Sequence, residues 1–327
     1  MTSLTRLNLH ENQLIYMPPS IALLSGLKVL TMQSNGIHVL PKPLCKLYKL
    51  ESLDFSYNGM KKLLPYVGSL SHLRSLILAE NELVELPIQT GRLKKLELLM
   101  LNKNKLDILH PTIGQLCCLT TLSLSYNRLT EIPSELYDLT NLKYLALDHN
   151  QLAYLSGAIS SIKLACEIRL DNNLLTELPN SIGSLKSLQI LSLGGNVFRE
   201  LPDFLTALRS LKDLWVSEEH IFCSDGSSPS WIVDISGLTQ LHIDNQPKRN
   251  LPDVVRLQGI GVVVDWIIRI NDSRRSSSLS LTHFGLSECP YAPYRNLTSL
   301  DISDNKIGAL SIEVLDLPTL VDLNVSR

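Results

Sequence analysis

Apolar residues return along this chain with a fixed period of 23 residues. The stretch 119–127 reads LTTLSLSYN, and the same frame, LxxLxLxxN, holds from residue 4 to residue 211 without an insertion or a deletion. A constant period of about 20 to 50 residues is typical of a solenoid, in which each unit stacks on its two neighbours. The pattern therefore predicts one continuous core shared by many small units, because each unit alone is too short to bury its own core.

Each unit predicts a strand followed by a compact turn. The LxxLxL segment alternates apolar and polar positions after its first step, which indicates a short strand with one buried face. Strands of successive units would lie parallel, about 4.8 Å apart. A recurrent proline and an apolar position three residues later predict a 3₁₀ or helical turn on the returning side. We therefore predict an α/β horseshoe solenoid with a parallel concave sheet and short convex turns.

An asparagine follows the strand in every unit. A buried amide is costly unless its donors and its acceptor are hydrogen bonded. We expect these side chains to form a ladder that bonds to the backbone of adjacent units, which explains why the spacing is so strict. The expected ladder consists of Asn12, Asn35, Asn58, Asn81, Asn104, Asn127, Asn150, Asn173 and Asn196.

The full frame, LxxLxLxxNxLxxLPxxIxxLxx, is read at 119–141 and 188–210. It resembles the typical leucine-rich repeat. The 23-residue length and the LPxxI motif look like the intracellular Ras-group class, which includes Ras-binding scaffolds, Ras suppressor proteins, epithelial polarity scaffolds and the arrays of Roco-type kinases. The resemblance implies a protein-binding array, with a small GTPase or a phosphatase as the partner.

The period breaks after residue 211, which suggests how the chain is organised. We expect residues 1–270 to form a leucine-rich repeat array with irregular repeats after 211 and a C-terminal helix near 252–270. The run NDSRRSSS at 271–278 predicts a polar joint. The frame restarts over 279–327 and stops within a repeat, so we expect a segment of a larger protein. The pattern leaves open whether 279–327 continues the same sheet or begins another.

Composition and charge argue against several classes of function. The formal net charge of −2 and the lack of a basic run argue against nucleic-acid binding. The longest apolar stretch, 254–270, contains charged residues and is too short to cross a bilayer, so we expect no membrane insertion. Six irregularly spaced cysteines without a preceding signal peptide favour a reducing compartment, and hence a cytoplasmic location.

Catalytic and metal-binding motifs do not emerge from the sequence. Gly259 and Gly261 are not followed by a phosphate-loop pattern, and no serine lies in a GxSxG frame. No set of histidine, cysteine or acidic residues has metal-ligand spacing. We therefore expect neither enzyme activity nor a cofactor nor a metal.

The solvent-facing strand positions are the candidate binding surface. Exposed apolar and aromatic residues on such a face usually contact a partner, although packing does not constrain these positions and they can also vary freely. An apolar and aromatic patch is expected near the middle of the array, and an arginine and a tryptophan lie in an acidic zone further along. The candidate partner-binding residues are Tyr57, Ile77, Leu98, Met100, Tyr126, Tyr144, Arg169 and Trp215.

The most favoured function is a protein-binding scaffold or adaptor in intracellular signalling. The alternative is the targeting or regulatory array of a larger signalling enzyme, such as a Roco-type kinase, a GTPase or a cyclase, with its catalytic domain outside this segment. Extracellular or immune recognition is a third hypothesis, and the absence of clustered cysteines disfavours it.

Overall fold

The computed structural model describes residues 3–198, 201–217, 230–244, 252–290 and 296–326. The chain divides into two compact units, Met1–Ser192 and Leu193–Arg327, here called unit 1 and unit 2. Among the described residues, eleven strands, β1 to β11, follow one another in sequence order in a parallel sheet, and three more, β12 to β14, form a second parallel sheet. The predicted solenoid fold is confirmed.

Unit 1 contains the first nine strands, and each has three residues. Its strands are β1 (Arg6–Asn8), β2 (Val29–Thr31), β3 (Ser52–Asp54), β4 (Ser75–Ile77), β5 (Leu98–Met100), β6 (Thr121–Ser123), β7 (Tyr144–Ala146), β8 (Glu167–Arg169) and β9 (Ile190–Ser192). The middle residue of each strand from Leu30 to Leu191 is fully buried, and the two flanking residues face the other side of the sheet. Corresponding residues pair in register, so each inner-face column is a row of neighbours.

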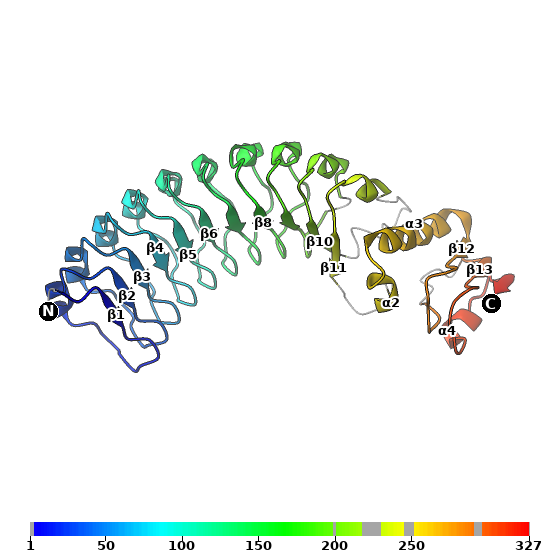
Figure 1. Cartoon of the computed structure of the whole chain (residues 1–327), viewed down its shortest axis with the longest axis horizontal. Coiled ribbons are helices and arrows are strands. Elements are labelled where there is room, and N and C mark those ends of the chain that lie inside the picture. The colour runs from blue at the N-terminus through cyan, green and yellow to red at the C-terminus, as the bar shows by residue number, and fades with distance from the viewer. Residues whose placement is uncertain (1–2, 199–200, 218–229, 245–251, 291–295, 327) are drawn as a thin grey trace. The chain divides into compact units, whose positions relative to one another are not determined.

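A five-residue 3₁₀ turn follows each of the first eight strands of unit 1. Figure 1 shows that, within this unit, the turns lie on the outer side of the curved stack and the strands on the inner side. Proline at the residue before a turn has the extended φ that the turn requires, −62° at Pro133 for example. The turns are η1 (Pro19–Leu23), η2 (Lys42–Lys46), η3 (Pro65–Ser69), η4 (Ile88–Arg92), η5 (Pro111–Gln115), η6 (Ser134–Asp138), η7 (Gly157–Ser161) and η8 (Asn180–Ser184).

Unit 2 combines two further repeats, a long helix and the second sheet. Residues 218–229, in the irregular stretch expected after 211, lie outside the described residues. The elements are η9 (Asp203–Ala207), β10 (Asp213–Ser217), η10 (Ser230–Asp234), β11 (Gln240–Asp244), α2 (Asp253–Arg256), α3 (Ile260–Ser276), β12 (Ser278–Ser280), β13 (Ser299–Asp301), α4 (Ile312–Leu315) and β14 (Asp322–Asn324).

The structure differs from the predicted boundaries around residues 271–278. Helix α3 continues to Ser276, so most of the segment expected to be a polar joint is helical. Two of its polar side chains, Asn271 and Ser273, are buried, and the Ser273 hydroxyl donates to the Ile270 carbonyl at 2.7 Å. Serine and asparagine side chains can thus be accommodated within a helix when tertiary contacts hold it.

The second run of the repeat frame forms its own sheet. Strands β12, β13 and β14 pair in parallel, and the Asn305 amide donates to the carbonyls of Leu281 and Ile302 at 2.7 and 3.0 Å. Helix α3 packs on β12, with the Trp266 ring edge-on to Phe284 at a centroid distance of 5.0 Å. Residues 279–327 therefore do not extend the sheet that contains β11.

Candidate functional site

The inner face of unit 1 displays an apolar pair on β4 and β5. Ile77 and Met100 are register partners on these adjacent strands, and Leu98 lies two residues earlier on β5, on the same face. All three are half-buried, since the buried leucines between them occupy the opposite face of the sheet. These three candidate residues therefore form one apolar surface.

Strands β7 and β8 bring an aromatic ring and a cation together. The Arg169 guanidinium carbon lies 5.8 Å from the centroid of the Tyr144 ring, a cation–π distance. The Arg169 Nε also donates to the Glu167 carboxylate at 2.6 Å. Burial raises the pKa of the Tyr144 hydroxyl. The arginine is thus held in place by two partners while about half of its side chain stays exposed.

Small residues separate these two groups. Ser123 on β6 and Ala146 on β7 are register partners, and both are buried. In the same column Met100 precedes them and Arg169 follows them, and both of these have longer side chains. The inner face therefore offers apolar contact at β4–β5 and aromatic and polar contact at β7–β8.

A column of side chains follows the strands, one residue before each ladder asparagine. Tyr57 and Tyr126 belong to it and are 56% and 47% exposed. The Tyr126 ring stacks on His149 with 3.8 Å between centroids. His149 lies between two further partners, with Nδ1 3.2 Å from an Asp148 carboxylate oxygen and Nε2 3.2 Å from the Asn172 amide nitrogen. This column, here called the rim, continues the surface formed by the strands.

The backbone of this rim is left-handed. The φ angles of Tyr57 and Tyr126 are +54° and +56°, and the same conformation recurs at Lys103 and His149. Side chains other than glycine, asparagine and aspartate pay an energetic cost there. The ninth repeat has the expected glycine, Gly195, at φ +62°. Backbone preference therefore does not explain tyrosine at two of these positions.

The ladder asparagines bond to adjacent repeats in one repeated pattern. The Asn127 amide nitrogen donates to the carbonyl of Leu101 in the preceding repeat at 3.0 Å and to that of Leu124 in its own at 2.9 Å. Its side-chain oxygen accepts from the Leu106 N–H at 3.0 Å. Asn81, Asn104, Asn150 and Asn173 make the same bonds. The side chains expected to be structural thus hold the turn beneath the rim.

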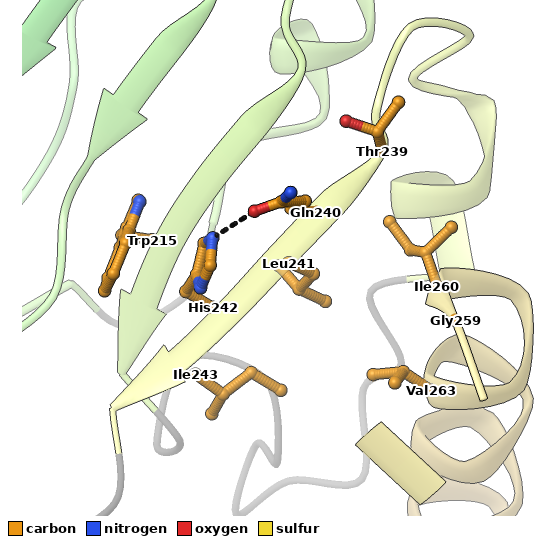
Figure 2. Close-up of a pocket in the computed structure, with 9 residues that line it drawn as sticks. All are labelled: Trp215, Thr239, Gln240, Leu241, His242, Ile243, Gly259, Ile260 and Val263. Carbon is orange, nitrogen blue, oxygen red and sulfur yellow. Dashed lines mark hydrogen bonds between the residues drawn. The ribbon is translucent and has the colours of Figure 1, made fainter. Parts of the chain in front are cut away.

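Trp215, the last candidate residue, belongs to unit 2. It lies on β10, is 39% exposed, and stacks on His242 of β11 at a centroid distance of 3.8 Å (Figure 2). His242 in turn is 3.1 Å from the Gln240 side-chain oxygen. Both rings border a pocket between β11 and the start of α3. The repeat pattern indicates that these positions face solvent, but it gives no sign of a pocket, because α3 is not a repeat element.

The described residues contain no cluster of three or more histidine, cysteine or acidic side chains that could hold a metal ion. Cys45, Cys117, Cys118, Cys166 and Cys289 are free thiols. Within the described part of the chain, the helices are too short or too polar to cross a bilayer.

Comparison with known proteins agrees with this geometry. Residues 119–161 match the family described as "Leucine Rich repeats (2 copies)", and residues 295–315 match "Leucine Rich repeat". This chain is a leucine-rich repeat protein. No curated protein sequence matches it significantly. Leucine-rich repeat proteins generally act by binding other proteins, and the fold is an interaction fold rather than a catalytic one.

Solved leucine-rich repeat structures resemble the chain over much of its length. A leucine-rich repeat protein of Leptospira interrogans is 26% identical with a TM-score of 0.62, covering 100% of this chain and 79% of its own. The ectodomain of an Arabidopsis thaliana membrane receptor kinase, in complex with CASPARIAN STRIP INTEGRITY FACTOR 2, is 27% identical with a TM-score of 0.64. That match covers 98% of this leucine-rich repeat chain but only 38% of the receptor.

A third solved structure has so low a sequence identity to this chain that the similarity shows a common fold and no more. The Drosophila Toll–Spatzle complex is 23% identical with a TM-score of 0.61, and the match covers 76% of this chain and 34% of the other. These similarities do not distinguish the intracellular LPxxI class from other leucine-rich repeat proteins.

Proposed function

We propose that this leucine-rich repeat protein is a scaffold or adaptor in intracellular signalling, with its protein partner on the inner face of unit 1. The observation that carries the proposal is the pair of tyrosines on the rim. Tyr57 and Tyr126 adopt a left-handed backbone that disfavours them, and both are about half exposed. Exposed tyrosines supply large contact areas with few rotatable bonds, which suits an interface.

The strands beside the rim support a partner that makes both apolar and polar contacts. Ile77 and Met100 would cover an apolar part of the partner, and the Tyr144–Arg169 pair would meet a polar or anionic part. Arg169 is already oriented by Glu167, so less side-chain entropy would be lost on binding. A small GTPase or a phosphatase is the partner class that the resemblance to Ras-group arrays implies.

A cytoplasmic location forms part of this proposal. It is supported by the free thiols of the described cysteines, including the neighbouring Cys117 and Cys118, which are exposed. The alternative, a regulatory array of a larger signalling enzyme, uses the same face and differs only in whether the same gene also encodes a catalytic domain. Reading the complete open reading frame tests that alternative directly.

The experiment compares two exposed tyrosines. Tyr126 on the inner rim and Tyr48 after turn η2 are 47% and 53% exposed, so Tyr126→Glu and Tyr48→Glu place the same charge on similarly accessible positions. A photoreactive amino acid replacing Met100 first identifies the partner in cells that express the chain. We expect Tyr126→Glu to reduce binding of the identified partner at least about tenfold and Tyr48→Glu to leave it unchanged. Equal affinities for the two variants, both folded by circular dichroism, would place the interface elsewhere.

A further inference from the structure

Strand β11 ends its sheet with an unpaired edge. In the strict repeats the N–H of the third apolar residue donates to the next strand, as Leu124 N–H does to the Ala146 carbonyl at 2.8 Å. The carbonyl before each strand accepts two N–H groups from the next repeat, as Lys212 does from Thr239 and Gln240 at 2.9 Å each. The equivalent groups of β11 are the Ile243 N–H and the Thr239 carbonyl.

In a strand, the backbone groups of every second residue point to the same edge, so those of Leu241 point the same way as the Ile243 N–H and the Thr239 carbonyl. The Leu241 N–H and carbonyl therefore point to the same edge, away from β10. Within the described residues, β11 pairs only with β10, and none of these edge groups has another hydrogen-bond partner. The edge thus presents the spacing of donors and acceptors that an extended chain requires.

A pocket of about 320 Å³ lies along this edge. Figure 2 shows the side chains of Leu241 and Ile243 pointing from β11 toward α3, and Ile260 and Val263 of the helix facing them. The helix begins after Gly259, where φ is +96° and where no atom lies within 4 Å of the position a Cβ would take. The start of α3 is thus open at Gly259, which is one of the residues that line the pocket.

We propose that the groove between β11 and α3 binds an extended peptide segment of a partner protein as an additional strand. The backbone edge supplies the hydrogen bonds, and the facing side chains of Leu241, Ile243, Ile260 and Val263 take the apolar residues of the peptide. Because side chains alternate along a strand, every second residue of the peptide would be apolar. The residues between them would face the Trp215–His242 stack, which favours aromatic or planar polar groups.

This binding mode is independent of the inner face of unit 1, because every residue it uses lies in unit 2. It also has a requirement that purely apolar binding does not have. The peptide must donate and accept hydrogen bonds through its own backbone at alternate residues.

The first test uses a random peptide library displayed on phage, selected against the whole chain. We expect enriched peptides with apolar residues at every second position. Each enriched peptide is then synthesised with one backbone amide methylated at a time. Methylation should weaken binding by about tenfold or more at alternate positions and have little effect at the positions between. No enrichment, or an equal response at all positions, would overturn the proposal.

The second test changes the edge itself. Ile243→Pro removes the outward N–H without removing a hydrogen bond to β10, and proline is tolerated where an edge-strand N–H faces outward. Ile243→Val is the matched control, because it keeps the N–H and trims the same buried side chain. We expect Ile243→Pro to lose the enriched peptides and Ile243→Val to bind them within about threefold of the parent. Equal binding by the two variants would refute strand addition, and the methylated peptides test the same point on the unaltered chain.

Discussion

Unit 1 and unit 2 use the same repeat frame in two different ways. In unit 1 each of the first eight strands is followed by a five-residue 3₁₀ turn, and each asparagine from Asn35 onward bonds to the repeat before it. In unit 2 a 17-residue helix, α3, follows β11, and the frame resumes in a separate sheet. The short turns of unit 1 pack on one another from repeat to repeat, whereas α3 packs on β12 and places Trp266 against Phe284.

The difference shows where each unit obtains its stability. The strands and turns of unit 1 repeat the same set of contacts, so stability is approximately a sum over neighbouring repeats. Helix α3 instead depends on a few large side chains, of which Trp266 is 1% exposed and contacts Phe284. Unit 2 should therefore be sensitive to single large residues, and unit 1 to the small residues and amides that keep its spacing.

The largest loss of stability is expected when Trp266 is replaced. Trp266→Ala removes a fully buried ring and should lower the free energy of unfolding by about 3–5 kcal/mol. Trp215→Ala removes the same side chain from a 39% exposed position of the same unit and should cost clearly less. Denaturant unfolding measures both. Equal losses would mean that the ring of Trp266 does not form the centre of this core.

Replacing a glycine with alanine should change the stability in opposite directions at Gly114 of unit 1 and at Gly261 of unit 2. At Gly114 an added Cβ would clash with the Glu135 carbonyl oxygen of the next turn, so Gly114→Ala should destabilise by about 1–3 kcal/mol. At Gly261 in α3 nothing lies within 4 Å, and Gly261→Ala should stabilise by about 0.5–1 kcal/mol. Thermal melts distinguish the two. Destabilisation by both substitutions would mean that α3 is packed as tightly at Gly261 as the stacked turns are at Gly114.

The asparagine bonds allow a direct comparison between the two sheets. Asn127 in unit 1 and Asn305 in unit 2 both donate to a carbonyl of the preceding repeat and accept one N–H from it at 3.0 Å. Asn127→Ala should cost about 1–3 kcal/mol, because buried backbone groups lose their partners. Asn305→Ala should cost less, since Asn305 is only partly buried. Unchanged unfolding of both variants would exclude an energetic role for the ladder.

The smallest effect on stability is expected at Tyr126. Tyr126→Asn keeps a residue that tolerates the left-handed conformation but loses the stack on His149, so the two changes should nearly cancel, within about 0.5 kcal/mol. Binding of the partner should nevertheless fall, because the exposed ring is gone. A strong loss of stability in calorimetry would mean that the tyrosine is retained for folding rather than for binding.

Part of the candidate site could be predicted from the repeat frame. The frame assigns Ile77 and Met100 to one column, and the register places them side by side. It does not give the stack of Tyr126 on His149 or the cation–π pair of Arg169 and Tyr144, because these depend on side-chain directions. Nor does it indicate the left-handed backbone of the rim, since serine, glutamate, lysine and tyrosine all occur there.

The amino-acid sequence by itself determined the strands, the turns and their order, because every important contact in the strict repeats joins residues at a fixed separation along the chain. Tertiary structure alone decided where α3 ends, that residues 279–327 form a second sheet, and that a pocket opens beside β11. These features arise where the period stops. There, the burial of residues such as Asn271 and Trp266 outweighs local preference, and no repeated spacing records which residues will meet.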